Sequence, residues 1–192
     1  MIDINMTLNL TDILQTQGVE ALAMPNVLPL FKSVSFTAGS TILSAGERWY
    51  NLLAIKQGIF RLYYLDSNGK ESNKGFFSAG QILAPMARSA IEQPVKFYIE
   101  ALTDVNAYQC KYCALTTALQ PFAQSQMFFQ QLTEQLLEDK INRELMFLQL
   151  DARKRYQVFQ QNYPELCQQI PLRHIASYLG MTDVTLSRIR HS

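Results

Sequence analysis

Hydrophobic positions follow three successive patterns along this chain of 192 residues. Over residues 8–32 they recur at helical spacing, although glycine and proline interrupt the run. From residue 34 to residue 113 the sequence is rich in β-branched and aromatic residues, and turn signals recur about every ten residues. The strongest signal is Asn68-Gly69, because both residues tolerate a positive φ and lie between two strand-like runs. Residues 34–113 are therefore predicted to form an all-β roll, sandwich or barrel.

The pattern after Pro121 is helical, because apolar residues recur every three to four positions up to residue 150 with no glycine or proline among them. A helix of about 29 residues would be roughly 43 Å long, which is more than the cover of a small β domain requires. Either the helix belongs to the core of the β domain, or part of its apolar stripe pairs with the same helix of a second chain. The length favours pairing, although Asp139 and Arg143 crowd one possible seam. The stripe consists of Phe129, Leu132, Leu136, Leu137, Ile141, Leu145 and Leu148.

The C-terminal residues predict a short helix, a turn and then a pair of helices. Residues 151–162 form the short helix, and Pro164 and Pro171 bracket the turn. Residues 172–190 form the pair, which is divided at Gly180 because glycine leaves a helix with a positive φ without a steric penalty.

The helical pair has the composition of a helix-turn-helix. Its apolar positions face one another, and Ala176 is small where two helices must cross closely. Thr182 is expected to cap the second helix by accepting from the amide of Val184 or Thr185. The outer face of that helix carries short polar side chains and arginines, which suit phosphates and base edges. A buried helical hairpin shares the apolar spacing alone, but here all these features occur in register, which predicts DNA binding.

Composition and charge agree with this division. Apolar residues make up 48% of the chain and charged residues 17%, which favours a packed core over disorder. The net charge is +1, but residues 151–192 carry six basic and three acidic side chains, whereas residues 1–150 carry eleven and thirteen. A basic tail on a mildly acidic body suits a body that senses and a tail that contacts phosphate.

The same sequence predicts a cytoplasmic protein. It shows no basic segment followed by an apolar stretch at its start, so no signal peptide is expected. It has no run of about 18 apolar residues, so no membrane partner is expected. Its three cysteines, Cys110, Cys113 and Cys167, are few and odd in number, which fits a reducing compartment.

The order of these parts resembles the cyclic-AMP receptor/FNR (Crp/Fnr) family of bacterial transcription regulators. The most specific stretch is "RY..F...YP.L...IP...IASYLG.T..TLSRIR" within residues 151–190, and "GERWYNLLAIKQGIFRLYYLDSNGKE" (46–71) resembles the sensor strands of the family. The resemblance implies an α+β fold in three parts. These are a cyclic-nucleotide-binding-like β-roll, or jelly roll, with an N-terminal helix (1–120), a connecting and dimerisation helix (121–150) and a helix-turn-helix (151–192).

The resemblance also implies positions for DNA contacts. Base-reading positions fall on Asp183, Val184 and Arg188, and phosphate-contacting hydroxyls fall on Thr182 and Thr185. Arg188 is the strongest candidate because a guanidinium binds guanine O6 and N7 with two hydrogen bonds. The carboxylate of Asp183 either accepts from cytosine N4 or stabilises the helix N-terminus, and Val184 suits a thymine methyl group. The candidate set is Thr182, Asp183, Val184, Thr185, Ser187, Arg188, Arg190 and Arg173. Because the sequence stops at Ser192, the usual β-hairpin wing is expected to be missing or vestigial.

The sensor part departs from the cyclic-nucleotide-binding members at decisive positions. After "GQIL", Ala84-Pro85 stand where the family has Gly-Glu, and Arg88 with its neighbouring serine comes too early to bind the phosphate. The register of "YIEALTD" places Lys96-Phe97 at the phosphate position instead. Without the glutamate and the bidentate arginine, a tight cyclic-AMP site is not expected.

The degenerate pocket leaves three alternatives: it binds another small molecule, it binds nothing, or its own aromatic residues close it. We interpret those aromatic residues (Trp49, Phe76, Phe77 and Phe97) as core. The candidate effector-pocket residues are Ile82, Leu83, Ala84, Lys96 and Phe97.

No cofactor, metal or enzymatic site is expected. The iron–sulfur members carry an N-terminal cysteine cluster, but the first cysteine here is Cys110. Cys110 and Cys113 have CxxC spacing without a second pair, so a four-ligand site is incomplete and buried, inert cysteines are preferred to a redox switch. His174 and His191 both lie in the DNA-binding segment, which leaves no histidine for haem or for catalysis in the sensor part.

The sequence therefore predicts a sequence-specific regulator that binds a near-palindromic site on double-stranded DNA as a homodimer. Two recognition helices would enter major grooves about 34 Å apart, and affinity would fall steeply with salt. An unidentified small-molecule effector and RNA polymerase are further partners that the resemblance implies. The alternative is an effector-binding or protein-interaction β-roll that has lost DNA binding.

Overall fold

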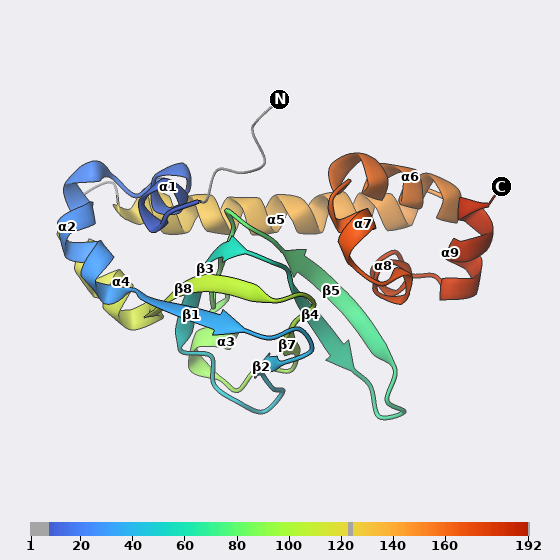
Figure 1. Cartoon of the computed structure of the whole chain (residues 1–192), viewed down its shortest axis with the longest axis horizontal. Helices are drawn as coiled ribbons and strands as arrows, with labels where there is room; N and C mark the ends of the chain where they lie inside the picture. Colours follow the sequence, from blue (N-terminus) through green and yellow to red (C-terminus); the bar gives the residue numbers. More distant parts are fainter. Residues whose placement is uncertain (1–7, 123–124, 192) are drawn as a thin grey trace.

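The computed structural model describes residues 8–122 and 125–191. A β-roll lies below a long helix that runs along the molecule, helices of the N-terminal segment cover one end of that helix, and the C-terminal helices gather at the other end (Figure 1). The outer limits predicted at residues 1 and 192, and residues 123–124 of the predicted long helix, lie outside the described residues.

The N-terminal segment forms short helices, as its spacing predicts. They are α1 (Leu10–Thr16), η1 (Ala21–Ala23), α2 (Met24–Val27) and η2 (Leu28–Leu30). A capping box starts α1, because the side chain of Asn9 accepts from the amide of Asp12 at 2.9 Å and the side chain of Asp12 accepts from the amide of Asn9. Ile13 and Leu14 of α1 are buried in the same hydrophobic core as Phe128 of the long helix.

Within the described residues, the strands form two four-stranded antiparallel sheets, ordered β1-β8-β3-β6 and β2-β7-β4-β5. The strands are β1 (Lys32–Phe36), β2 (Thr41–Leu43), β3 (Asn51–Gln57), β4 (Phe60–Leu65), β5 (Glu71–Phe77), β6 (Ile82–Leu83), β7 (Tyr98–Ala101) and β8 (Val105–Lys111), and α3 (Arg88–Glu92) lies between β6 and β7. The predicted β-rich section from residue 34 to 113 corresponds closely to these strands.

Strand β3 shows why the strand-rich residues 34–113 contain nearly continuous apolar runs. Leu53 and Ile55 are buried between the two sheets, whereas Leu52 and Ala54 face the core shared with the N-terminal helices. A strand buried on both faces loses the alternation of a half-exposed strand.

The predicted hairpin at Asn68-Gly69 joins β4 to β5, but only Gly69 has a positive φ, of 78°. Instead, the carboxylate of Asp66 accepts from the amides of Asn68 and Lys70 and holds the turn.

The long helix is α5 (Ser125–Gln149), and α4 (Tyr112–Leu119) precedes it. Its predicted apolar stripe divides between two environments. Leu132 is buried in the core with the N-terminal helices, whereas Leu137, Ile141, Leu145 and Leu148 lie exposed along one face, with Leu148 77% exposed. The stripe is thus partly core and partly free surface.

The C-terminal segment consists of α6 (Ala152–Asn162), α7 (Leu166–Gln169), α8 (Leu172–Tyr178) and α9 (Asp183–Arg190). The prediction of a plain turn between Pro164 and Pro171 is wrong, because α7 forms there and buries Leu166. The prediction that residue 113 ends the strand section is also corrected. Strand β8 ends at Lys111, and Cys113 already belongs to α4.

Candidate functional site

The helical pair α8–α9 has the expected turn. Gly180 has a φ of +65°, which favours glycine, and a Cβ added there would lie 2.6 Å from Cε1 of Phe147 in α5, whose ring would have to shift. The amide of Thr185 donates to Oγ1 of Thr182 at 3.1 Å, which confirms Thr182 as the N-cap of α9. Ile175, Leu179 and Leu186 are fully buried between the helices.

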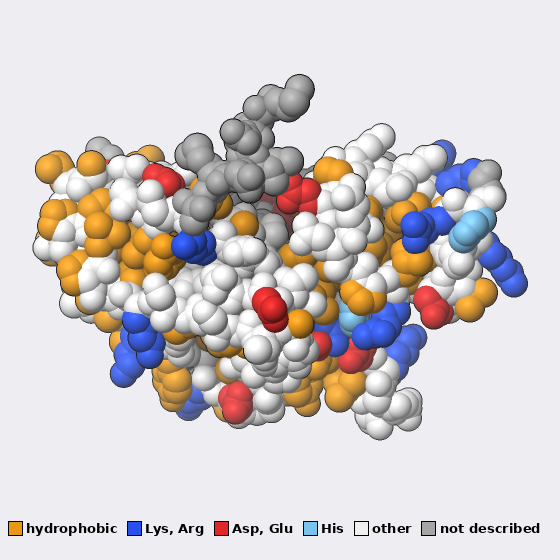
Figure 2. Space-filling model, in the orientation of Figure 1, with side chains coloured by type: hydrophobic (Ala, Val, Ile, Leu, Met, Phe, Trp, Pro, Cys, Tyr) orange, Lys and Arg blue, Asp and Glu red, His pale blue; other side chains and the backbone are white. Residues whose placement is uncertain are grey.

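The outer face of α9 is open to solvent. Asp183, Val184, Arg188 and Arg190 are exposed, and Lys and Arg side chains gather over the C-terminal helices (Figure 2). Oδ1 of Asp183 accepts from the amide of Val184 at 2.9 Å, a contact within the first turn of α9. The other candidates are placed as follows: Thr182 and Arg173 are exposed, and Thr185 and Ser187 are partly buried.

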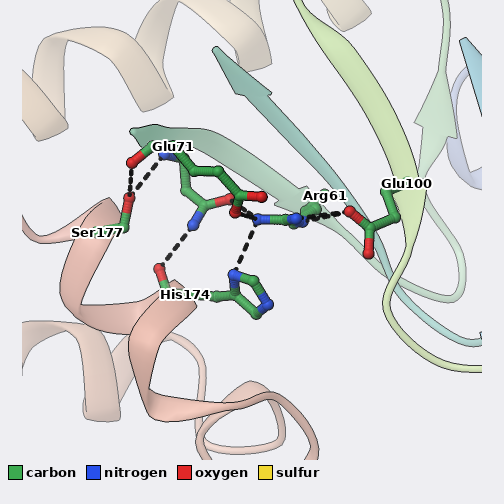
Figure 3. Close-up of polar contacts among 6 residues, drawn as sticks. Arg61, Glu71, Glu100, His174 and Ser177 are labelled. Atoms are coloured by element: carbon green, nitrogen blue, oxygen red, sulfur yellow. Dashed lines mark hydrogen bonds and ion pairs between the residues drawn. The ribbon is translucent and has the colours of Figure 1, made fainter. Parts of the chain in front are cut away.

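A buried ion-pair cluster joins the β-roll to α8 (Figure 3). Arg61 on β4 is 3% exposed, and its guanidinium pairs with Glu71 of β5 and with Glu100 of β7, the latter at 2.6 Å between Nη2 and Oε2. Nη1 of Arg61 also donates to Nδ1 of His174 in α8 at 2.9 Å. Because a guanidinium only donates, His174 must be neutral here, with its proton on Nε2.

Backbone groups complete this junction. The side-chain amide of Asn73 donates to the carbonyl of His174 at 3.1 Å, and the amide of Asn73 donates to Oγ of Ser177 at 3.0 Å. Oγ of Ser177 donates to the carbonyl of Glu71 at 3.1 Å. These polar bonds seat α8 on β5. We call the six residues the Arg61 cluster: Arg61, Glu71, Asn73, Glu100, His174 and Ser177.

Burial and the neighbouring Arg61 and Arg173 lower the pKa of His174 to about 4, against a weaker opposing effect of Glu71. The hydrogen bond from Arg61 lowers the pKa of Glu71. The cluster is therefore arranged around a neutral imidazole and an ionised carboxylate.

Acid is expected to weaken this junction. A histidine with a lowered pKa contributes fully above its ordinary pKa of about 6.5, and its contribution falls as the pH drops from there toward 4. By pH 5 the expected loss of unfolding free energy is about 2 kcal/mol. Urea unfolding at pH 7 and pH 5 measures it. His174→Gln, which cannot titrate, should show a smaller change over the same interval, and an equal change in both proteins would contradict the assignment.

A cavity of about 390 Å³ lies between the β-roll, α5 and the C-terminal segment. The structure places all five candidate pocket residues on its wall, together with the four aromatic residues that were interpreted as core. Phe97 is buried and meets Trp49 edge-to-face, with ring centroids 5.8 Å apart. These rings line the cavity without filling it.

The charged residues on the cavity wall come from separate parts of the chain. Lys74 of β5 and Lys140 of α5 join the predicted Lys96, and Asp139 is the acidic side chain on the described wall. Burial lowers the pKa of both Lys74 and Lys140 and raises that of Asp139. Arg88 does not line the cavity and pairs instead with Glu92 on the exposed surface of α3.

Two aromatic side chains of the C-terminal segment also form this wall, namely Tyr163 and Tyr178. Sequence reasoning missed these tyrosines, as well as Lys74, Lys140 and the Arg61 cluster. No local motif marks any of them, because each acts through partners far away in the sequence.

Cys110 and Cys113 differ in their exposure to solvent. Cys110 is buried on β8, and burial raises its pKa to about 12, so its thiol is unreactive at neutral pH. Cys113 is exposed on α4, so the expectation that both cysteines are buried is wrong for this residue. Across residues 8–122 and 125–191, no group of three or more His, Cys, Asp and Glu side chains could hold a metal ion.

No helix in the described part of the chain has the length and apolarity needed to cross a membrane.

Comparisons with known proteins agree with this architecture. Residues 33–120 match the family model of the cyclic nucleotide-binding domain. FixK2 from Bradyrhizobium japonicum superposes with a TM-score of 0.73 at 20% identity, over 84% of this chain and 83% of FixK2. The c-di-GMP-responsive global regulator CLP from Xanthomonas campestris gives a TM-score of 0.70 at 14% identity, over 90% of each chain.

A Crp/Fnr-family protein from Eubacterium rectale gives a TM-score of 0.69 at 15% identity, over 90% of this chain and 82% of that protein. A comparison with curated protein sequences finds no match. The resemblance to Crp/Fnr proteins is thus confirmed for the fold, as is the α+β class with a jelly-roll-like part and C-terminal helices.

Proposed function

We propose that this chain is a sequence-specific DNA-binding transcription regulator of the Crp/Fnr type. The observation that carries the proposal is the capped, solvent-exposed helix α9, which presents Arg188 and Arg190 from a helix-turn-helix whose opposite face is buried. Among the described residues, neither guanidinium group forms a hydrogen bond or an ion pair, so both are available to contact base edges and phosphates. The three-part division at residues 120 and 150 belongs to the same proposal.

The proposed regulator is a homodimer that pairs through α5. Leu137, Ile141, Leu145 and Leu148 recur every three to four residues on one exposed face, which is the pattern of a helix–helix seam. Arg143, which crowded one possible seam in the sequence, donates to the carbonyl of Tyr178 at 3.0 Å and so points into the fold. In a dimer, a two-fold axis would relate the two α9 helices, as a near-palindromic operator requires.

The cavity is the proposed effector site. Its position between sensor strands, α5 and the C-terminal tyrosines suits a site that transmits occupancy to the DNA-binding segment. Cyclic AMP is not the proposed effector, because Ala84 stands on the wall where the family has its Gly-Glu pair. RNA polymerase remains a proposed partner of the bound regulator.

Arg188→Ala is expected to abolish enrichment of a specific site from random duplex DNA. Loss of a bidentate guanine contact in each half-site should weaken specific binding roughly thirtyfold or more. Lys154→Ala is the matched control, because it removes one exposed positive charge from the same segment at α6, away from α9. Selection followed by titration of the enriched duplex measures both variants.

Equal losses in the two variants would mean that charge alone binds the DNA, and the base-reading role would be wrong. Sedimentation of the same proteins tests the dimer separately. A chain that remains monomeric at micromolar concentration and on its DNA site would exclude pairing through α5.

A further inference from the structure

Two lysine side chains, those of Lys74 and Lys140, line the same cavity. Nζ of Lys140 donates to the carbonyl of Lys74 at 3.4 Å, and Nζ of Lys74 lies 4.7 Å from the ring centroid of Phe97. The ion pairs in the described ranges involve only arginines, so no carboxylate there lies within ion-pair distance of either lysine. Among the described residues, the close partners of these two cations are the rings of Phe97 and Tyr64 and the carbonyl of Lys74.

The surroundings of these lysines favour an anion. Burial lowers the pKa of each ammonium group, and the charge of Lys74 further lowers the pKa of Lys140, so the charged forms are destabilised at this wall. Lys96 adds a third positive charge to the wall, against the single carboxylate of Asp139 among the described wall residues. An anion placed between Lys74 and Lys140 would remove this destabilisation.

The rest of the wall is suited to an apolar ring. Trp49 and Phe97 form an edge-to-face pair, and Leu62, Leu83 and Tyr178 continue the apolar lining. Aromatic side chains contribute large contact areas with preferred edge and face geometries. A volume of about 390 Å³ lies near the lower end of the range of small-molecule sites.

We infer that the cavity binds a small aromatic carboxylate, with its carboxylate group between Lys74 and Lys140 and its ring against Trp49 and Phe97. This inference deepens the proposed function, because it names the ligand class of the proposed effector site. It differs from cyclic-nucleotide recognition, since the cations come from β5 and α5 and no sugar hydroxyl has to be satisfied.

The bound carboxylate would be linked to the DNA-binding segment by a short chain of hydrogen bonds. The carbonyl of Lys74 also accepts from Nη1 of Arg143 at 3.2 Å, and Nη2 of Arg143 donates to the carbonyl of Tyr178 at the end of α8. Tyr178 itself lines the cavity. The ligand therefore contacts both the strand that carries the Arg61 cluster and the helix that this cluster holds.

Trp49 makes the inference directly testable, because it is the single tryptophan of the chain and it lies on the cavity wall. Its fluorescence is titrated in the full-length protein, without DNA, using benzoate, phenylacetate and 4-hydroxyphenylacetate. The amide of each acid and cyclic AMP are titrated in parallel. At least one acid should bind saturably and about tenfold or more tightly than its amide, because only the acid forms charge-assisted hydrogen bonds with the lysines.

Lys74→Met should weaken binding of that acid by about tenfold or more, whereas Lys32→Met, an exposed lysine on β1, should leave it unchanged. The inference is wrong if no acid binds more tightly than its amide, if both variants bind alike, or if cyclic AMP binds more tightly than every acid. Arg188→Ala separates this result from the proposed function. This variant should still bind the acid but no longer bind the specific DNA site. Loss of DNA binding alone therefore does not contradict the ligand assignment.

Discussion

Arg61→Leu should lower the free energy of unfolding by about 3 kcal/mol or more, which makes it one of the two most damaging substitutions that the structure indicates. Arg61 is 3% exposed and is the common partner of Glu71, Glu100 and His174. Its removal leaves Glu100 with a largely buried charge and no partner, which costs far more than a lost surface contact. Urea unfolding followed by circular dichroism measures the loss.

Arg88→Leu is the matched control, because Arg88 also pairs with a glutamate, four residues away, but both side chains are mostly exposed. Its effect should stay within about 0.5 kcal/mol. Similar losses for the two variants would show that burial of Arg61 has no special cost. Because His174 and Ser177 belong to α8, Arg61→Leu should also make the α8–α9 segment more susceptible to limited proteolysis than the control does.

Gly58→Ala is expected to be the other large loss, of about 3 kcal/mol or more. Gly58 turns the chain between β3 and β4 with a φ of +92°. A Cβ there would lie 2.3 Å from the carbonyl oxygen of Asp104 and 2.9 Å from Cα of Val105, so the backbone of the opposite turn would have to move. Thermal unfolding of the variant tests this.

Gly46→Ala separates the two causes of that loss. Gly46 has the same φ of +92°, but nothing lies within 4 Å of its added Cβ. Its cost should therefore be that of the backbone conformation alone, about 1 kcal/mol. If Gly58→Ala and Gly46→Ala unfold at the same temperature, the contact with the Asp104 turn does not contribute to stability.

Features that depend on neighbouring residues could be predicted from the sequence. The Thr182 cap and the Gly180 turn follow from groups within a few residues of one another, and the structure shows both. The fold class followed from changes of hydrophobic period, since strand and helix periods differ along whole sections. Lys96 was placed at the pocket by counting from the next strand, and it does line the cavity.

Features that depend on tertiary contacts could not be predicted in this way. Arg61 and His174 are 113 residues apart, and an arginine in an apolar strand carries no mark of its partner. The same holds for Lys140, which reads as an ordinary solvent-facing residue of α5 until β5 is placed beside it. Helix α7 was missed because four residues between two prolines are too few to show a period. Cys113 was misjudged because the strand was taken two residues too far.

The two ends of α5 are buried in different hydrophobic cores, so the helix connects the N-terminal helices to the C-terminal ones. Phe128 packs among the N-terminal helices and Met146 among the C-terminal ones. Between them, Lys140 and Arg143 hydrogen-bond the middle of α5 to β5. Twenty-five residues give an arm of about 37 Å. A tilt of about 10° at the N-terminal end would carry the far end through about 6 Å, more than the 3.4 Å step along one DNA strand. In the proposed regulator, a tilt of this size would first have to break the hydrogen bonds from Lys140 and Arg143 to β5, and it would then move the C-terminal helices by more than one base step.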